Sequence, residues 1–367
     1  MRGVLRIDKT LALLIGILVV GGGFAFASAI FGLVARGSTN MSSVAFNHAV
    51  LGVGLGLVAL LIASRLDYRL WRRFAPHLFV ATLILTAAVF IPQLGFEHGG
   101  GRRWLSFAGL TIQPAEFLKA GAIIMAATYF CAIRTRIESF RWGLGGLLAI
   151  LAAPILILIA QPDLGTLGVI VASVLAIYFT AGARFRDFLI ILLTGIIALA
   201  LLAYMRPYVL DRIEVFFNPQ QGPQAEGYQV RQSLIAIGSG GLAGRGFGQS
   251  VQKFTYLPEP MGDSIFAVIG EEFGFIGAMA VIGIFLALAL RGFTVAAQAS
   301  ESFGALLAVG ISTYLVAEAF INIAAMLGLA PLTGIPLTFV SQGGSAMLAS
   351  LGSAGILLSI SRKKNRA

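Results

Sequence analysis

Long apolar segments recur along the whole chain and restrict what it can fold into. Each has roughly 20 residues, enough to cross a hydrocarbon core about 30 Å thick. Of 367 residues, 58% are hydrophobic and 11% charged, far from the mix of a soluble domain. We predict an all-α integral membrane protein with about ten transmembrane helices, forming a single membrane domain over residues 1–367. The predicted spans are 11–34, 47–64, 74–95, 113–133, 143–160, 164–182, 186–205, 263–290, 302–328 and 338–361.

The basic residues predict the orientation and argue against nucleic acid as a partner. The net charge is +10, but Lys and Arg lie in short clusters between apolar runs, which indicates contacts with membrane lipid. With a cytoplasmic amino terminus, 17 basic residues fall in inside segments and 8 in outside segments. The positive-inside rule then places both termini in the cytoplasm. The single cysteine, Cys131, excludes an intramolecular disulfide.

One long loop between predicted spans seven and eight is the largest segment outside the membrane. It covers about residues 206–262 and is placed on the extracytoplasmic side by the predicted orientation. Residues 226–237 are expected to form a short helix along the membrane surface, followed by a glycine-rich segment at 238–248. We therefore expect function to concentrate on the outer face.

Glu116 and Lys119 are ionisable residues inside predicted span four. Their i, i+3 spacing places them on one helix face, where they can neutralise each other. One interpretation is a structural ion pair between helices. In the other, the pair belongs to a site in which Arg102 and Arg103 bind phosphate oxygens at the outer interface. Trp104 fits that site and fits equally an ordinary interfacial aromatic belt.

Three further polar positions have both a structural and a functional interpretation. Asp163 lies in a tight outer hairpin, where a helix cap explains it as well as a site does. Glu318 and Asn322, at i, i+4 in span nine, form either a buried hydrogen-bonded pair or part of a polar cavity.

Asp263 ends the long loop and begins predicted span eight. At the outer membrane edge a carboxylate can reach a hydroxyl of a membrane-anchored sugar and act as a general base. The alternative is a helix N-cap, and the helix dipole would then lower the pKa of Asp263. Deeper in the span, Glu271 and Glu272 need partners, for which Lys119 is a candidate. The glycines Gly270, Gly274 and Gly277 predict a close-packing stripe on the Asp263 face.

Seven ordered segments of the chain resemble the SEDS proteins (shape, elongation, division and sporulation). The resemblance begins at about residue 101 and continues almost to the end. The segments are GRRW at 101–104, QPAEFLK at 113–119, QPDLGT at 161–166, YQVRQS at 228–233, GSGG at 238–241, LPE at 257–259 through Asp263 to EFGFIG at 272–277, and PLTGIPL at 331–337. Residues 250–260 resemble the division-type members more than the elongation-type members.

The resemblance implies a peptidoglycan glycosyltransferase of the bacterial cytoplasmic membrane. Such an enzyme polymerises lipid II with undecaprenyl pyrophosphate leaving, and its partners are a class B penicillin-binding protein transpeptidase and other division proteins. Asp263 corresponds to the acid that deprotonates the acceptor 4-hydroxyl. The predicted substrate-binding residues are Arg102, Arg103, Trp104, Glu116, Lys119, Asp163, Arg231 and Glu259. No cofactor is evident and no metal ligand is assigned. A divalent cation stays open, because Asp263, Glu116 and Glu271 show no ligand spacing.

The sequence departs from the family pattern at two places. Met261-Gly262 replace the usual His-Thr before the acid, and residues 341–346 read SQGGSA where SYGGSS is usual. Two alternatives to the enzyme are kept, the first because the intramembrane polar residues could also pass a charged headgroup and the second because of these departures. One is a lipid II flippase, and the other is a non-catalytic scaffold of the division complex.

Overall fold

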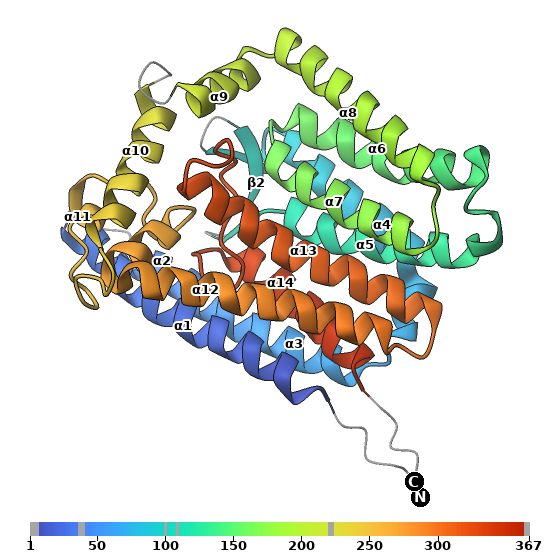
Figure 1. The fold of residues 1–367 in the computed structure, drawn as a ribbon, viewed down its shortest axis with the longest axis horizontal. Helices are drawn as coiled ribbons and strands as arrows, with labels where there is room; N and C mark the ends of the chain where they lie inside the picture. The colour runs from blue at the N-terminus through green and yellow to red at the C-terminus, as the bar shows by residue number, and fades with distance from the viewer. Residues whose placement is uncertain (1–6, 36–40, 99–100, 108–109, 219–223, 363–367) are drawn as a thin grey trace, which may run out of the picture.

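The computed structural model describes residues 7–35, 41–98, 101–107, 110–218 and 224–362, which form a mainly helical bundle (Figure 1). The first elements are α1 (Lys9–Ala35), α2 (Met41–Phe46), the π-helix η1 (Asn47–Gly54), α3 (Leu55–Arg65), α4 (Arg69–Ala87), the 3-10 helix η2 (Ala88–Phe90), β1 (Gly95–His98), β2 (Gly101–Phe107), β3 (Leu110–Ile112) and α5 (Ala115–Ala132). After them come η3 (Arg134–Arg136), η4 (Phe140–Leu144), α6 (Gly145–Ala160), α7 (Leu164–Thr180), α8 (Phe185–Met205), α9 (Pro207–Phe217), α10 (Gln224–Ser239), α11 (Gln252–Thr255), α12 (Ile265–Ala297), α13 (Ser302–Met326) and α14 (Gly344–Ile360).

Eight helical segments in the described part of the chain are long and apolar enough to cross a membrane. They cover predicted spans one to five and seven to nine. Two shorter apolar helices, α7 and α14, occupy the ranges predicted for spans six and ten. The predicted helical membrane fold is therefore confirmed, and the count of ten spans stays a prediction.

Several predicted span boundaries are wrong, each for a local reason. Span three was expected to reach residue 95, but its helical residues end at Phe90. Ile91 precedes Pro92 and takes an extended conformation (φ −73°, ψ 118°), as residues before proline prefer. Span ten was expected from residue 338, whereas α14 begins at Gly344 because the preceding residues form turns. Both α4 and α12 extend past their predicted ranges, since a helix can continue into the aqueous interface where charged residues are solvated.

A small antiparallel sheet joins α4 to α5 and was not predicted from the sequence. β1 pairs with β2, where Phe96 lies opposite Trp104, and β2 pairs with β3, where Leu105 lies opposite Ile112. The register of the first pair shifts between Phe96 and Glu97. The segment that carries Arg102 and Arg103 is therefore a strand, in which neighbouring side chains point to opposite faces.

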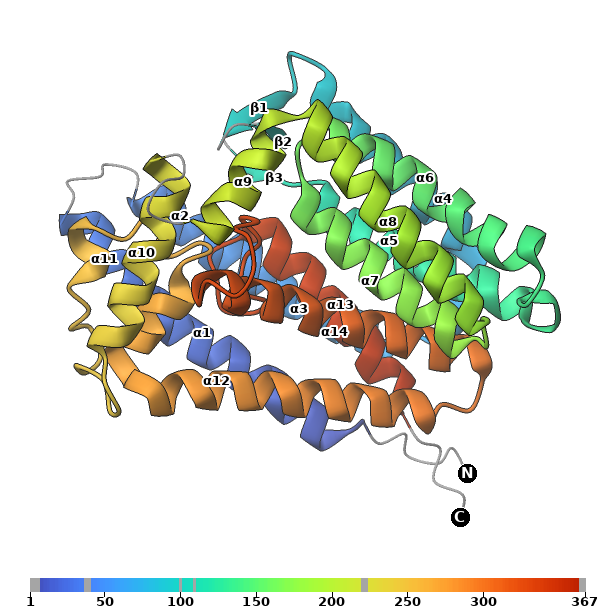
Figure 2. The same ribbon diagram turned by 45° about the horizontal axis from the view of Figure 1, so that its top comes forward.

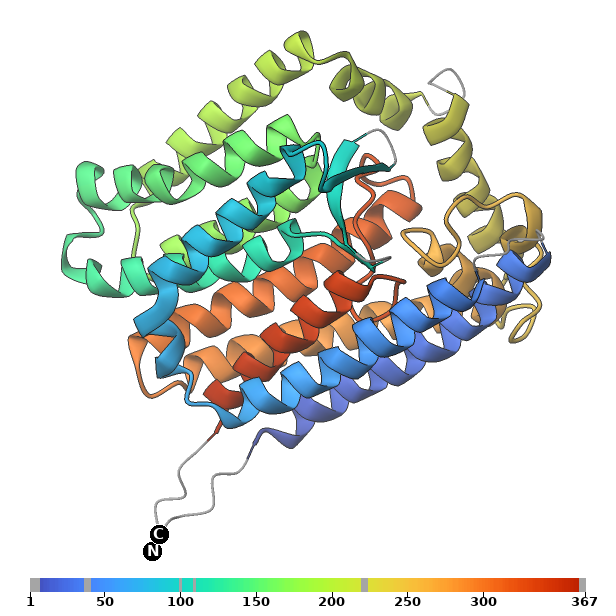
Figure 3. The same cartoon turned by 180° about the vertical axis from the view of Figure 1, so that it is seen from behind.

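Polar contacts join the elements at the end of the bundle where α1 begins and α14 ends (Figures 1 and 3). Asp8 Oδ2 accepts a hydrogen bond from Arg291 Nε at 2.9 Å, and the Asp8 amide donates to Ser361 Oγ at 3.2 Å. Arg69 forms an ion pair with Glu301 at 2.6 Å. These contacts tie α1, α12 and α14 together at the end that the sequence predicts to be cytoplasmic, an orientation that stays a prediction. The sheet, α10 and α11 lie toward the other end.

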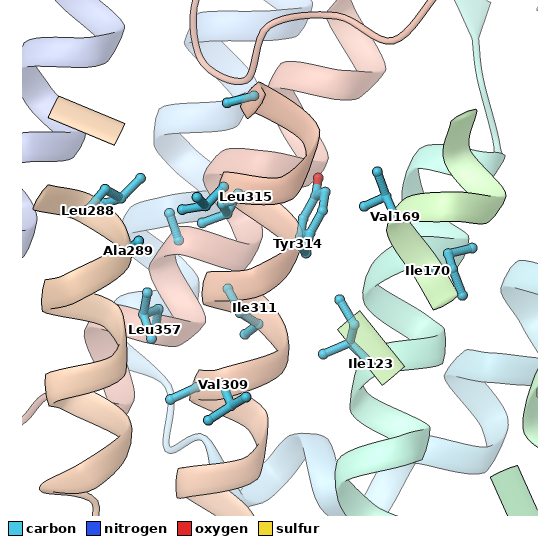
Figure 4. Packing of buried hydrophobic residues seen from close by; sticks show 14 of the residues in the cluster. Ile123, Val169, Ile170, Leu288, Ala289, Val309, Ile311, Tyr314, Leu315 and Leu357 are labelled. Atoms are coloured by element: carbon cyan, nitrogen blue, oxygen red, sulfur yellow. The ribbon is translucent and has the colours of Figure 1, made fainter. Parts of the chain in front are cut away.

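Helix α13 is the central element of the bundle and contacts α5, α7, α12 and α14. Figure 4 shows Ile311 and Leu315 of α13 among apolar side chains of its neighbours, with Tyr314 directed toward Val169 of α7. Most of α13 is buried, including its polar residues Glu318 and Asn322. Both therefore lie inside the protein, where their polar atoms need protein partners.

The predicted long loop contains three helices, α9, α10 and α11. The helix expected at 226–237 is present as α10, and it packs against α12 (Figure 2). Helix α8 leads into this region and is the most exposed of the span candidates. Only 6% of its most apolar 18-residue stretch is buried inside the protein. The loop is therefore a folded cap over α12, and its extracytoplasmic placement stays a prediction.

Helix α12 is interrupted at Gly274, which has φ 65° and ψ −162°. Essentially only glycine adopts this backbone region. The interruption exposes peptide groups of α12, and the glycine-rich segment bonds to them. The Phe275 amide donates to Gly241 O at 2.8 Å, and the Arg245 amide donates to Glu271 O at 3.0 Å. The predicted glycine stripe is thus not one continuous helix face.

We expect Gly274→Ala to lower the thermal stability of the purified protein in detergent. A non-glycine residue in this backbone region costs about 1–3 kcal/mol, and the new Cβ would lie 2.6 Å from Leu242 O. Gly283→Ala on the same helix is the control, because nothing lies within 4 Å of its added Cβ. An unchanged unfolding temperature for Gly274→Ala would contradict the described break.

Candidate active site

Asp263 lies in a tight turn between the long loop and α12, outside the membrane-spanning helix. The amides of Gly262 and Ser264 donate to Glu259 O at 3.0 and 3.2 Å and close this turn. Ser264, not Asp263, is the N-cap residue of α12. The predicted alternative of a plain helix cap at Asp263 is therefore wrong, and its partly exposed carboxylate is available for other contacts.

Gln229 of α10 holds the Asp263 carboxylate. Its Nε2 donates to Asp263 Oδ1 at 3.0 Å and to Ser264 Oγ at 3.0 Å. Burial raises the pKa of Asp263 from 3.8 to about 6; the hydrogen bond from Gln229 opposes the rise and the negative charge of Glu259 adds to it. The expectation that the helix dipole lowers this pKa is thus wrong, because desolvation outweighs it.

Helix α13 and the segment that follows it clamp the backbone of the Asp263 turn. Asn322 Nδ2 donates to Asp263 O at 2.7 Å and to Ile335 O at 2.8 Å. Ser341 Oγ donates to Gly262 O at 2.6 Å. Two bonds, one from α13 and one from the segment after it, therefore fix the carbonyl groups of Asp263 and Gly262, and the Asn322 bond to Ile335 O joins α13 to that segment.

The two departures from the family pattern meet at this clamp. The Gln342 amide donates to Met261 O at 2.7 Å. Met261 is buried, and its side chain packs with Phe26 and Ala29 of α1. Since the bond between the two segments joins backbone groups, it does not depend on which side chains occupy positions 261 and 342.

Glu259 lies close enough to Asp263 for its negative charge to raise the pKa of Asp263. Glu259 is exposed, and an added Cβ on Gly262 would lie 3.5 Å from its Oε2. Arg231 follows Gln229 by two residues on α10, and residues two apart do not share a helix face. Glu259 is therefore a neighbour of the Asp263 carboxylate, and the predicted role of Arg231 stays a prediction.

The predicted phosphate-binding residues separate into two environments. Arg103 donates from Nε to Gln161 O at 3.2 Å and from Nη2 to Pro162 O at 2.5 Å. Arg102 is exposed and lies 3.5 Å from Glu97 Oε2. In the structure the two guanidiniums have different partners, and alternate residues of a strand face opposite sides. Their joint binding of a phosphate stays a prediction. Trp104 is partly buried on the same strand.

Asp163 is the N-cap residue of α7. Its Oδ1 accepts from the Thr166 amide at 3.1 Å, and its Oδ2 accepts from Gln113 Nε2 at 3.3 Å. The side chain is 3% exposed. The structural interpretation therefore accounts for Asp163 as it stands.

Lys119 lies between two glutamates inside the bundle. Its Nζ is 2.8 Å from Glu116 Oε2 and 2.9 Å from Glu318 Oε2, and each side chain is 1% exposed. The nitrogen also lies 4.8 Å from the centre of the Tyr314 ring. The ion-pair interpretation of Glu116 and Lys119 is confirmed. Contact with a substrate would require the bundle to open.

Glu271 and Glu272 bind the part of the long loop that follows the glycine-rich segment, and Glu272 also binds α1; neither binds Lys119 as expected. Glu272 Oε1 accepts from Lys253 Nζ at 2.6 Å and from Ser28 Oγ at 2.6 Å. Glu271 Oε2 accepts from Ser250 Oγ at 2.6 Å. Among the described residues, no group of three or more His, Cys, Asp or Glu side chains is placed to hold a metal ion.

Gln229, Asn322 and Ser341 are the site residues that sequence reasoning did not assign. Gln229 lies within a segment that resembles the SEDS proteins, and Asn322 was considered only as a partner of Glu318. Ser341 was named only as part of a departing segment. None carries a charge, so the search for ionisable groups inside spans could not find them, although all three bind the Asp263 turn.

We predict that Asp263→Asn stabilises the protein at about pH 8. A carboxyl whose pKa rises on folding favours the folded state at low pH and loses that contribution as pH rises through the folded value. The stabilising effect of Asn should therefore shrink as pH falls through about 6 and vanish near 4. Asp163→Ala is the contrast and should destabilise by about 0.5–2 kcal/mol through loss of a cap. Thermal unfolding of both variants across pH measures these changes. A destabilised Asp263→Asn at pH 8 would contradict the raised pKa of Asp263.

Residues 9–366 match the model of the cell cycle protein family FtsW/RodA/SpoVE. The chain is 40% identical over 313 residues to stage V sporulation protein E of Bacillus subtilis, covering 85% of this chain and 86% of that protein. It is 39% identical over 310 residues to the probable peptidoglycan glycosyltransferase FtsW of Trichlorobacter lovleyi, covering 84% and 81%.

Two solved structures share the fold. A chain from a structure of a peptidoglycan synthase complex that coordinates polymerization and crosslinking has a TM-score of 0.78 at 26% identity, over 99% of this chain and all of that one. RodA, the rod shape determining protein of Thermus thermophilus, has a TM-score of 0.70 at 26% identity over 99% of each chain. The resemblance noted from the sequence is confirmed and extends to the first hundred residues. The chain therefore belongs to the FtsW/RodA/SpoVE family of cell cycle proteins.

Proposed function

We propose that this protein is a peptidoglycan glycosyltransferase that polymerises lipid II during cell division. Relatives at 36 to 39% identity over more than four fifths of the chain are named probable peptidoglycan glycosyltransferases. The sequence resembles division-type members within residues 250–260. The reaction takes place at the outer face of the cytoplasmic membrane, with both termini of the chain in the cytoplasm.

Asp263 is the general base of the proposed reaction. It takes the proton from the 4-hydroxyl of the acceptor N-acetylglucosamine as the oxygen bonds to the anomeric carbon of the donor N-acetylmuramic acid. The bond from that carbon to undecaprenyl pyrophosphate breaks, and the electron pair leaves with the pyrophosphate. Each turnover thus forms one glycosidic bond, and the proton on Asp263 is afterwards released to water.

The observation that carries this assignment is the combination of a fixed and partly exposed carboxylate with a raised pKa. A general base works best when its pKa lies near the operating pH, and the pKa of Asp263 is raised to about 6. Gln229 and Asn322 hold the carboxylate and its backbone in place. Positioning of this kind lowers the entropic cost of reaching the acceptor hydroxyl.

Arg102 is the best candidate for binding pyrophosphate among the predicted basic residues. It is exposed, and its Nε lies 3.5 Å from Glu97 Oε2, which is long for an ion pair. Arg103 already binds two backbone carbonyls. Trp104, Arg231 and Glu259 remain proposed substrate contacts at the same end of the bundle.

A class B penicillin-binding protein is the proposed partner, with other division proteins. A structural relative comes from a peptidoglycan synthase complex that couples polymerization to crosslinking. A polymerase that releases uncrosslinked glycan strands needs a transpeptidase nearby, which makes such a complex chemically sensible. The proposed substrate lipid II reaches the site from the membrane.

Asp263→Ala should reduce lipid II polymerisation by at least about a hundredfold, the scale of losing a general base. The purified protein with its transpeptidase partner is given lipid II in detergent, and glycan chains are separated on a gel. Asp263→Asn is the folding control, since it is expected to be stable yet inactive. Equal activity of wild type and Asp263→Asn would remove Asp263 as the base.

The same assay separates the proposed enzyme from the two alternatives. A flippase by itself forms no glycan polymer in detergent, where there is no membrane to cross. A non-catalytic scaffold predicts that cells carrying Asp263→Asn at normal expression divide as well as wild type.

We expect polymerisation to depend on a single ionisation with an apparent pKa of about 6. Because the base must be ionised, the rate should be level above this value and fall about tenfold per pH unit below it. A pH profile of kcat/KM with enough substrate for initial rates measures this. A rate that stays level down to about pH 4 would contradict the raised pKa of the base.

A further inference from the structure

Two carboxyl groups and one ammonium group are buried together where α5 meets α13. Lys119 Nζ lies 2.8 Å from Glu116 Oε2 and 2.9 Å from Glu318 Oε2, and all three side chains are 1% exposed. If both acids were ionised, the cluster would carry one uncompensated negative charge. Burying such a charge is far more costly than taking up a proton. One of the two acids therefore holds a proton.

The unpartnered oxygens of α13 indicate which acid that is. Glu318 Oε1 and Asn322 Oδ1 are both buried, and neither has a hydrogen-bond partner among the described residues. The two residues are at i, i+4, so their side chains are neighbours on one face of α13. Two neighbouring side chains of α13 thus each contain a buried acceptor that is left unsatisfied. A proton on Glu318 makes one of them a donor and satisfies both.

We propose that Glu318 is held as a neutral acid that donates a hydrogen bond to Asn322 Oδ1 and thereby positions the Asp263 turn. This bond fixes the orientation of the Asn322 amide. Its Nδ2 then points at Asp263 O, 2.7 Å away, and at Ile335 O, 2.8 Å away. Glu116 supplies the negative charge that Lys119 needs. The positioning role rests on the proposed function of Asp263, whereas the protonation of Glu318 does not.

Two substitutions that each remove one acid separate this arrangement from a generic ion pair. In Glu318→Gln the amide nitrogen replaces the acidic proton as donor to Asn322, and Glu116 still neutralises Lys119. In Glu116→Gln the only remaining acid, Glu318, must ionise to neutralise Lys119, and Asn322 loses its donor. Both variants carry the same net charge. Asn322→Asp removes the amide donor to Asp263 and serves as the positive control.

Infrared spectra of the purified protein detect the proton directly. At about pH 8, where Asp263 is ionised, the wild type should show the C=O stretch of a buried protonated acid. This band should be absent in both Glu318→Gln and Glu116→Gln. Lipid II polymerisation should stay within about threefold of wild type in Glu318→Gln and fall about tenfold or more in Glu116→Gln and Asn322→Asp, the scale of one lost buried hydrogen bond.

Thermal unfolding of each variant accompanies both measurements. The proposal would be overturned if the infrared band persisted in Glu318→Gln. It would also be overturned if Glu116→Gln were as active and as stable as Glu318→Gln. If the wild type itself made no polymer, the proposed function would be contradicted, but the protonation of Glu318 would not. The infrared band and the order of unfolding temperatures, with Glu318→Gln above Glu116→Gln, would then still decide the protonation of Glu318.

Discussion

Charged groups that are buried between apolar helices must be neutralised within the protein, because no water is available to solvate them. Glu271 and Glu272 of α12 meet this requirement with Lys253, Ser28 and Ser250. Their partners come from α1 and from the loop that precedes α12. The same contacts that neutralise the two acids therefore hold residues 250–253 of the loop against α12. The Asp263 turn lies between this anchored part of the loop and α12.

Asp263 has fewer partners than Glu271 and Glu272. Its carboxylate accepts a single side-chain hydrogen bond, from Gln229, and has no ion pair among the described residues. Burial is then only partly offset, and the pKa of Asp263 rises to about 6. A site that keeps a carboxylate under-solvated gives up stability for reactivity, a common exchange in active sites. Glu271 and Glu272, which have several partners, stabilise the fold. Asp263, which has a single side-chain partner, keeps a carboxylate with a raised pKa.

The clamp around Asp263 is formed mainly by uncharged groups. Asn322 and Ser341 bind the two carbonyls beside the acid, and the Gln342 amide binds the next one. Such contacts tolerate changes in neighbouring side chains, which explains how a turn with unusual residues at Met261 and Gly262 can still be formed. The chain shares this fold with RodA, whose identity to it is 26%.

The sequence by itself determined the helical membrane fold, the i, i+3 pairing of Glu116 with Lys119, and the placement of Asp263 beside α12. These follow from local features, namely apolar length, spacing along one helix and motif order. Only the tertiary structure decided that Arg102 and Arg103 diverge on a strand, that Glu318 completes the Lys119 cluster, and that Gln229 and Asn322 hold the acid. Those contacts join residues far apart in the chain, and hydrogen-bond partners of that kind leave no periodic pattern in a single sequence. For the same reason the pKa of Asp263 was misjudged, since desolvation depends on what packs around the group.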